Sequence, residues 1–527
     1  MGMYLNCGNE AFRQIRNGTY VDKTGLIDYI NQTIDTARSL TCFSRPRRFG
    51  KSFAAAMLAA YYDKSCDSGE LFDGLEISHH HSYKKYLNAF DVIYLDITWF
   101  ISVTDDIRDV LSVIQRSVIE ELREAFPDYV KADETILANA ILNVSRKTNE
   151  KFFLIIDEWD ALFREAKHND ELQKSYLRFL RGLFKGGPSM KSALAGAYMT
   201  GILPIKKYGT ESALTDFEEY SMTNPDMLSE YVGFTEEEVR SLCLKNEVDF
   251  KKMKRWYDGY SFEDHGSVYS PDSVMSAVKR KRFRNYWTGS ETYESLKSYI
   301  SMNFDGLKDA IVAMLGGGKI KIEIARFQND ITSFNSKDDV LTLLIHLGYL
   351  GYHEKTGQVY IPNLEIAGAF QNAVEGDGWE EIASALASSE DLLQTTINED
   401  SAAVETALER IHDLNVSVLQ YNDENSLSCA VTLAYYTARN CYTIVREFPS
   451  GKGFTDLAFI PAPHMDKPAL LIELKYNKTA DGAIRQIRDR RYDGALSKYT
   501  DNLLLVGINY NKNDKGKKHT CIIERFR

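Results

Sequence analysis

The stretch Ser44-Arg45-Pro46-Arg47-Arg48-Phe49-Gly50-Lys51-Ser52 decides the architecture of the first half of the chain. A short β-prone run, residues 40–43, precedes it, and an apolar stretch with helical character, residues 53–62, follows it. Where a loop leads from a strand into a helix, backbone N–H groups and the helix dipole favour a bound anion. The stretch therefore predicts a phosphate site at the edge of an α/β sheet.

The second half of this loop follows the phosphate-loop pattern G-x-x-x-x-G-K-[ST]. Gly50 lets backbone N–H groups approach phosphate, Lys51 reaches its outer oxygens, and the Ser52 hydroxyl can ligate Mg²⁺. Arg45 stands where the first glycine of the pattern belongs. Because a bare Gly-Lys-Ser is frequent by chance, a basic helix cap is the alternative interpretation. The predicted nucleotide contacts in this loop are Arg45, Arg48, Phe49, Gly50, Lys51 and Ser52.

A later apolar run supplies the acidic partner that such a site requires. Phe152–Ile156 is followed directly by Asp157 and Glu158. In an ATPase, the first carboxylate would hold Mg²⁺ and the second would activate the attacking water. A solvated turn is the alternative, but the position in an alternating α/β region favours the ATPase interpretation. Thr200, after the run 195–199, is predicted to lie near the γ-phosphate.

The order of the elements predicts a parallel sheet. Short apolar runs alternate with helical patterns, which is typical of strands connected by crossover helices on both faces of a sheet. The expected strands and helices are 40–43, 53–62, 90–96, 104–126, 152–156, 171–184 and 195–199.

Composition describes an ordinary globular chain. Its 527 residues carry 63 Lys and Arg against 75 Asp and Glu, a formal net charge of -12. No apolar stretch approaches the ~20 residues that span a bilayer. The N-terminus lacks the pattern of a secretory signal, and seven dispersed cysteines argue against a disulfide framework. We therefore expect a cytoplasmic protein without a membrane partner.

The middle of the chain is predicted to be mainly helical, from about 235 to 395. The run 340–350 leads into a predicted hairpin that ends at 361, which is the order of a winged-helix-like module. The predicted domains are 1–235 (P-loop domain), 236–395 (helical and winged-helix-like connector) and 396–527 (a second α/β unit).

The C-terminal unit contains a second set of residues suited to phosphate chemistry. Asp456 follows a glycine-rich turn, and Glu473 and Lys475 alternate along an apolar strand, so that both point to one face. Two converging carboxylates hold a divalent metal, and a lysine orients water or stabilises charge at phosphorus. From these residues alone, a metal-dependent nuclease site and a pair of surface positions are about equally favoured.

Two clusters of basic residues are candidate contacts to nucleic acid. Six Lys and Arg against two Asp lie between 475 and 491, which is compatible with phosphate binding and equally with a solvated helix face. The run Lys279-Arg280-Lys281-Arg282 is expected to be a solvated helix end.

The first half of the chain resembles the AAA-ATPase-like proteins of bacteria and archaea. The similarity rests on the loop described above, on Tyr20-Val21-Asp22-Lys23-Thr24, Asp157-Glu158, Thr200-Gly201-Ile202 and Trp256-Tyr257-Asp258-Gly259-Tyr260, over roughly residues 5–290. The missing first glycine is normal in that family. The resemblance implies an ATP-binding module related to AAA and STAND-type switch ATPases.

The C-terminal unit resembles the PD-(D/E)XK nuclease superfamily, whose fold is that of restriction endonucleases, over roughly residues 420–510. The resemblance rests on the segment Glu447–Asp456, the Glu473–Lys475 strand, and Gln486-Ile487 with Tyr492. It implies that Gln486 belongs to the catalytic set and that Glu424 joins Asp456 and Glu473 around Mg²⁺, with Mn²⁺ as a substitute. Thr455 stands where an arginine is common.

Together these patterns predict an ATPase joined to a metal-dependent DNase-like domain, with the ATP state controlling access of DNA. A role in defence against foreign DNA or in mobile-element biology fits such a fusion by analogy. Two alternatives remain at this point: a switch or regulator whose nuclease fold only binds DNA or a protein, and an oligomeric remodeller that acts on protein. A homo-oligomer is compatible with all three.

Overall fold

The computed structural model describes residues 2–526 except 186, 206, 209–210, 213, 263–265, 288–291, 303, 328–333, 375–378, 415–423, 451–452, 463–464, 466, 490–498, 500–501 and 515–517. The chain divides into two compact units. The first comprises Met1–Trp287 and Lys321–Ile366, and the second comprises Thr288–Ile320 and Ala367–Arg527. In the described part of the chain, no helix combines the length and the apolar character needed to cross a membrane.

A parallel sheet forms the centre of the first unit, as the sequence predicts. Its five strands lie in the order β2-β3-β4-β1-β7, and every neighbouring pair is parallel. The strands are β1 Leu40–Ser44, β2 Asp91–Asp96, β3 Phe152–Asp157, β4 Leu194–Gly201 and β7 Glu218–Tyr220.

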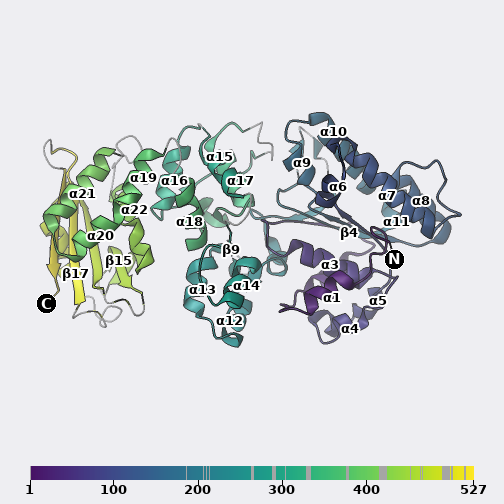
Figure 1. Ribbon diagram of the computed structural model, residues 1–527, viewed down its shortest axis with the longest axis horizontal. Coiled ribbons are helices and arrows are strands. Elements are labelled where there is room, and N and C mark those ends of the chain that lie inside the picture. Colours follow the sequence, from purple (N-terminus) through teal and green to yellow (C-terminus); the bar gives the residue numbers. More distant parts are fainter. Residues whose placement is uncertain are drawn as a thin grey trace. The chain divides into compact units, whose positions relative to one another are not determined.

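Helices cover both faces of this sheet (Figure 1). On one face Tyr62 of α3 stacks on Phe153 of β3, with ring centroids 4.2 Å apart. On the other face, Leu154 and Ile156 join a core with the long amphipathic helices. The first face carries α1 Glu10–Arg16, α3 Lys51–Tyr62, α4 Gly69–Phe72 and α5 Tyr83–Tyr86, and the second α7 Val110–Ala125, α8 Leu137–Thr148 and α10 Asp170–Phe184. The remaining helices of this part are α2 Gly25–Thr33, α6 Ile97–Val103, α9 Ala161–Glu165 and α11 Gly187–Ala193.

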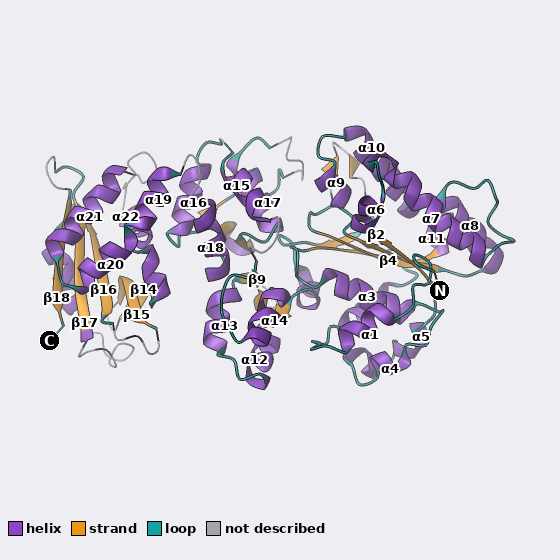
Figure 2. Ribbon diagram, viewed as in Figure 1, coloured by secondary structure: helices purple, strands orange, loops and turns teal. Residues whose placement is uncertain are grey.

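A smaller helical layer follows the sheet within the same unit. Its three helices pack on a three-stranded antiparallel sheet around Met253, Tyr257 and Val274 (Figure 2). The elements are β8 Phe234–Thr235, α12 Glu236–Lys245, α13 Phe250–Tyr257, β9 Tyr260–Phe262, β10 Gly266–Tyr269 and α14 Pro271–Arg280.

The helix and hairpin predicted at 340–361 are present in the first unit. Helix α17, Lys337–His346, leads into β12, Gly351–His353, and β13, Gln358–Tyr360, which pair antiparallel. The strand β11, Ile320–Lys321, joins them at one edge. The three-domain boundaries at 235 and 395 stay a prediction.

The second unit contains a mixed five-stranded sheet in the order β14-β15-β16-β17-β18. Only β16 and β17 run parallel. The strands are β14 Tyr442–Ser450, β15 Gly453–Pro461, β16 Ala469–Tyr476, β17 Leu503–Tyr510 and β18 His519–Arg525. The helices are α15 Thr292–Ile300, α16 Leu307–Leu315, α19 Glu380–Ala387, α20 Ser389–Ile397, α21 Ser401–Leu414, α22 Glu424–Ala434 and α23 Ala480–Asp489, and α18 Leu364–Ala373 lies at the boundary of the units.

Three sequence-based boundaries differ from the structure. The helix expected at 104–126 begins only at Val110, because α6 and a short 3-10 turn occupy the preceding residues. The apolar run 502–508 predicts a last strand, but in the structure that strand, β17, is followed by β18, which pairs with it. The middle region also contains the small sheet β8-β10-β9, which the helical prediction left out.

One prediction concerns Gly259, in the segment between α13 and β9. Its φ is +116°, and a Cβ there would lie 2.1 Å from the carbonyl oxygen of Pro362. Gly74, with φ +74° and open space around it, is the matched control. In urea denaturation we expect Gly74→Ala to lower the free energy of unfolding by about 1 kcal/mol, from backbone strain alone. Gly259→Ala should lower it by about 4 kcal/mol, because strain and overpacking add. Equal effects of the two variants would contradict the close approach.

Candidate functional site

The loop after β1 places backbone N–H groups at the start of α3. Gly50 caps the helix with φ +89°, and Lys51 and Ser52 form its first turn. Arg48 also has a positive φ, +69°. A non-glycine residue in this region is strained and typical of functional loops. The tight turn thereby orients the first N–H groups of α3 toward the loop interior.

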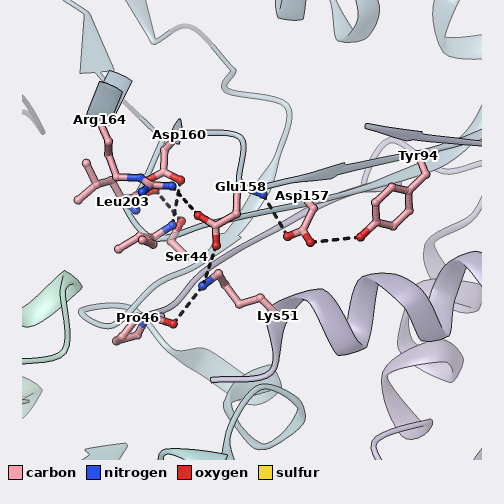
Figure 3. Close-up of polar contacts among 10 residues, drawn as sticks. Ser44, Pro46, Lys51, Tyr94, Asp157, Glu158, Asp160, Arg164 and Leu203 are labelled. Carbon is pink, nitrogen blue, oxygen red and sulfur yellow. Dashed lines mark hydrogen bonds and ion pairs between the residues drawn. The ribbon is translucent and has the colours of Figure 1, made fainter. Parts of the chain in front are cut away.

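The ammonium of Lys51 lies buried inside this loop. Its Nζ donates to the carbonyl oxygen of Pro46 at 3.0 Å and lies 3.4 Å from Oε1 of Glu158 (Figure 3). Only 3% of its side chain is exposed. A buried lysine requires oxygen acceptors of this kind. The predicted pair of Lys51 and Glu158 is therefore brought together across the ends of β1 and β3.

Two cations hold the carboxylate of Glu158: Lys51 lies at Oε1, and Arg164 lies at Oε2. Nη2 of Arg164 donates to its Oε2 at 2.6 Å, and Nε of Arg164 donates to Asp160 at 3.2 Å. Burial opposes ionisation of Glu158, but the charges of Lys51 and Arg164 outweigh it and hold the pKa below its ordinary value. Its φ is +52°, a conformation that a non-glycine residue keeps only where its surroundings enforce it.

Asp160 connects this network to the end of β4. Its Oδ1 accepts from the backbone N–H of Ile202 at 3.1 Å, and its Oδ2 accepts from that of Leu203 at 3.0 Å. At Gly201 a Cβ would lie 2.6 Å from the ring of Trp159, which leaves room only for glycine. The segment after β4 is thus fixed against the segment after β3.

Asp157 lies beside Glu158 but is held differently. Its Oδ2 accepts from the hydroxyl of Tyr94 on β2 at 3.1 Å, and its Oδ1 accepts from the N–H of Glu158. Burial raises the pKa of Asp157 to about 6, although a hydrogen bond from Ser52 partly opposes the shift. Ser52 and Asp157, the predicted magnesium ligands, therefore lie within hydrogen-bond reach of each other.

Thr200, near the end of β4, and Arg45, the residue after β1, are both buried. The N–H of Arg45 donates to Gly201 at 3.0 Å, and its guanidinium lies over the ring of Phe262, 4.9 Å from the centroid. Among the described residues, neither that guanidinium nor Oγ1 of Thr200 has a hydrogen-bond partner. Burial lowers the pKa of Arg45 to about 9.

A cavity of about 270 Å³ opens beside Gly50. Its walls are mostly apolar and come from α1, the segment before α2, α3, the segment before β8, and α14. Arg48 borders it and donates from Nη1 to Asp272 at 3.2 Å and to the carbonyl oxygen of Tyr286 at 2.8 Å. The lining includes Tyr20, Val21, Phe49, Phe53, Met57, Phe234 and Met275. Phe49, a predicted nucleotide contact, thus forms part of this wall.

The second predicted set lies on the sheet of the second unit. β15 and β16 pair antiparallel with Leu457 opposite Ile472, and this register places Asp456 opposite Glu473. Oδ2 of Asp456 accepts from the backbone N–H of Leu474 at 2.6 Å. Nζ of Lys475 donates to Oε1 of Glu473 at 3.0 Å. The structure therefore brings all three predicted residues to one point.

Gln486 and Glu424 approach the same point from two helices. Nε2 of Gln486 on α23 donates to Oε1 of Glu473. Oε1 of Glu424 on α22 lies 3.7 Å from Nζ of Lys475. Glu473 and Lys475 are buried, whereas about half of the Glu424 side chain is exposed. Tyr492, quoted in the resemblance, lies outside the described residues.

Within the described residues, no group of three or more His, Cys, Asp and Glu side chains has the arrangement of a metal cage. Magnesium does not require one, since it is usually held by one or two carboxylates with water and substrate phosphate. Each unit offers a pair of hydrogen-bonded carboxylates, Asp157 with Glu158 in the first and Asp456 with Glu473 in the second. The chemistry of these oxygen donors fits a hard divalent cation.

Two family patterns match the chain. Residues 6–210 match the family described as "Predicted AAA-ATPase", and residues 422–520 match the PD-(D/E)XK nuclease superfamily. The chain contains a domain of each family. The matched ranges hold both sites described above, with Lys51 and Glu158 in the AAA-ATPase-like domain and Asp456 to Gln486 in the nuclease-family domain.

The solved structures that the chain matches are distant. The Walker-type ATPase PABY2304 of Pyrococcus abyssi is 11% identical, with a TM-score of 0.33, and the match covers 66% of this chain and 94% of that chain. The ORC2 protein of Aeropyrum pernix, in ADPNP and ADP complexes, is 12% identical, with a TM-score of 0.31 and coverage of 69% and 98%. No curated protein matches the chain.

Sequence reasoning missed three residues of the AAA-ATPase-like site. Tyr94 holds Asp157, and Asp160 with Arg164 holds Glu158 and the end of β4. Asp160 and Arg164 are four apart on a helix, a spacing at which opposite charges meet. That spacing, directly after Asp157-Glu158, is the sequence signal by which Asp160 and Arg164 could have been found. Tyr94 has no such local signal, because its contact depends on the pairing of β2 with β3.

The buried Asp157 gives a prediction for stability against pH. The folded state binds its proton more tightly than the unfolded state, so the free energy of unfolding falls as pH rises from about 4 to about 6. Asp157→Asn removes that loss. At pH 8 we expect the variant to exceed wild type by up to about 3 kcal/mol, and the difference to shrink below pH 5. Urea denaturation at several pH values measures it. Asp133→Asn, at an exposed position, is the control, and a pH-independent difference for Asp157→Asn would contradict the assignment.

Proposed function

We propose that the AAA-ATPase-like domain binds and hydrolyses ATP at the loop Arg45–Ser52. The observation that carries the proposal is the buried ammonium of Lys51, held at the start of α3 by Pro46 and Glu158. A phosphate group offers this ammonium stronger, charged acceptors. The first N–H groups of α3 supply the remaining donors for the β- and γ-phosphates.

Each carboxylate of the pair takes a separate role. Glu158, once phosphate has replaced it as the partner of Lys51, has an oxygen free to accept a proton from the attacking water. Arg164 keeps the other oxygen in place. Ser52 and Asp157 would hold Mg²⁺, which neutralises charge on the phosphates when bound. Thr200 and Arg45, both buried, are proposed to contact the γ-phosphate.

The cavity beside Gly50 is proposed to hold the adenine base. Its volume of about 270 Å³ and its apolar, aromatic lining suit a flat heterocycle. Phe49 and Phe53 lie at the two ends of the turn that carries Gly50, so base and phosphates would be bound by one continuous segment. This also gives a role to Tyr20 and Val21, for which the resemblance supplied a pattern but no function.

We further propose that the nuclease-family domain cleaves DNA. Asp456 and Glu473 would hold Mg²⁺ or Mn²⁺, with Glu424 nearby, and the cation would polarise the phosphodiester when bound. Lys475, at the edge of the site, is positioned to orient the attacking water. Gln486 fixes the carboxylate of Glu473 by its hydrogen bond. The chain thus combines two phosphate-handling sites, and we propose that the ATP state controls access of DNA to the second, in defence or mobile-element biology.

The nucleotide site predicts distinct effects for two variants. Lys51→Ala should weaken ATP binding about 10²-fold, because a charged hydrogen-bond donor to phosphate is lost. Glu158→Gln should bind ATP as wild type does but hydrolyse it about 10²- to 10⁴-fold more slowly, because the proton acceptor is lost. Calorimetric titration and phosphate release measure the two effects. Lys84→Ala, at an exposed position of the same unit, is the control. Wild-type affinity in Lys51→Ala would refute the site.

The nuclease site predicts metal-dependent cleavage of plasmid or single-stranded DNA. Asp456→Ala should reduce the rate at least about 10³-fold, because the cation loses a carboxylate ligand. Asp481→Ala, which removes an exposed carboxylate on α23 that pairs with Arg485, should cut as wild type does. If wild type itself cuts nothing with Mg²⁺ or Mn²⁺, the nuclease fold serves binding, which is the regulator alternative. If Lys51→Ala cleaves DNA as wild type does at all ATP levels, the nucleotide site does not control the nuclease site.

A further inference from the structure

Helices α13 and α14 of the first unit carry a concentration of positive charge. Between Phe250 and Trp287 there are nine Lys and Arg against four Asp and Glu, in a chain whose net charge is -12. We define the α13–α14 basic surface by eight of them: Lys251, Lys252, Arg255, Lys279, Arg280, Lys281, Arg282 and Arg284. All but the partly buried Arg255 are exposed.

Packing brings the two halves of this surface together. Met253 and Tyr257 form the buried face of α13, so Lys251 and Arg255 lie on its outer face. The hydroxyl of Tyr257 donates to the carbonyl oxygen of Arg284 at 2.9 Å and accepts from its N–H at 3.1 Å. The basic residues after α14 are therefore anchored at the end of α13, and the two helices lie side by side in Figures 1 and 2.

The acidic residues that the structure describes in and next to this segment are already engaged, and Glu263 and Asp264 lie outside the described residues. Asp249 caps α13 through backbone N–H groups, and Asp272 accepts from Arg48. Asp258, with Glu236, pairs with Lys254, the ninth basic residue of the segment. Within the part of the chain that the structure describes, no ion pair involves Lys251, Lys252, Lys279, Lys281 or Arg282. Their positive charge is thus not neutralised within the fold.

Aromatic rings lie among these charges. The guanidinium carbons of Arg280 and Arg284 lie 5.6 and 5.2 Å from the ring centroid of Tyr286. Such contacts hold guanidinium groups in place while leaving their N–H donors available. A solvated helix end, the interpretation favoured by sequence alone, requires neither the anchoring by Tyr257 nor these stacked arginines.

In the nuclease-family domain, most of the described basic residues between 475 and 491 are engaged, and only Lys478 among them is exposed and in no described ion pair. Of the six basic residues between 475 and 491, Lys475 lies in the site. Arg485 and Arg488 pair with Asp481 and Glu524. Arg490 and Arg491 lie outside the described residues. The α13–α14 basic surface, with Lys251, Lys252, Lys279, Lys281 and Arg282 in no described ion pair, therefore offers more available cations than this stretch of the nuclease-family domain.

We infer that the α13–α14 basic surface binds the phosphate backbone of duplex DNA. The inference rests on the proposed function, because it names where the ATPase unit would hold the substrate of the nuclease-family domain. Phosphate contacts by Lys and Arg release counterions, so each contact contributes about 0.9 to the slope of log affinity against log salt. The surface reads no sequence, since it offers charge rather than donors directed at base edges.

The test compares two charge-matched variants of the full chain. Lys252→Gln/Lys279→Gln/Lys281→Gln/Arg282→Gln removes four charges from the surface. Lys84→Gln/Lys167→Gln/Lys174→Gln/Arg178→Gln removes four exposed charges elsewhere in the same unit. Both carry Asp456→Ala to prevent cleavage. Fluorescence anisotropy with a 30-base-pair duplex, from 50 to 300 mM KCl, gives affinity and salt slope, and ATP binding is measured in parallel.

The inference predicts that the surface variant binds the duplex roughly 10²-fold more weakly than the control and loses about 3 units of salt slope, with ATP binding unchanged. Equal affinity and slope in the two variants would overturn it, as would the absence of duplex binding by the parent chain. A surface variant that instead loses binding to an acidic polypeptide such as poly-glutamate, and not to DNA, would assign the surface to a protein partner. Loss of cleavage in Asp456→Ala is tested separately. DNA binding by the α13–α14 basic surface and DNA cleavage by the nuclease-family domain can therefore be refuted independently.

Discussion

A lysine ammonium buried at the start of α3 needs oxygen acceptors, and the AAA-ATPase-like domain is organised around that requirement. Pro46 supplies one acceptor from the loop itself, and Glu158 supplies the other from the end of β3. Because Glu158 lies at the end of β3, its contact with Lys51 requires the ends of β1 and β3 to meet at the same edge of the sheet. The strand order places β4 between them, so Arg164 and Asp160 extend the network across its end.

The buried network around Lys51 and Glu158 has properties that suit ligand binding. Lys51 and Arg164 balance the charge of Glu158 within a buried space, and Glu158 holds a strained backbone conformation, as does Arg48 in the loop before Lys51. Burial raises the pKa of Asp157 to about 6. Phosphate would offer Lys51 a charged acceptor, and Mg²⁺ would favour the ionised form of Asp157. In the second unit, a buried carboxylate has different partners. Glu473 on β16 accepts from Lys475 of the same strand and from Gln486 on α23, and Asp456 on β15 lies opposite it.

Local patterns predicted much of this from sequence. The alternation of apolar runs indicated a parallel sheet, and the loop before Lys51, the pair after β3 and the alternation of Glu473 with Lys475 each pointed to a side chain of a candidate site. What the sequence could not provide was pairing between distant elements. Tyr94 meets Asp157 only through the register of β2 and β3, and the cavity beside Gly50 is assembled from segments more than 200 residues apart. The terminal strand β18 was overlooked because its alternation is short and interrupted by charge.

The most direct test of the account is an experimental structure of the chain with a non-hydrolysable ATP analogue and Mg²⁺. The account predicts phosphates on the first turn of α3, Nζ of Lys51 transferred from Glu158 to a phosphate oxygen, and the base in the cavity lined by Phe49 and Phe53. An analogue bound elsewhere, or a Lys51–Glu158 pair still intact with the nucleotide present, would contradict it.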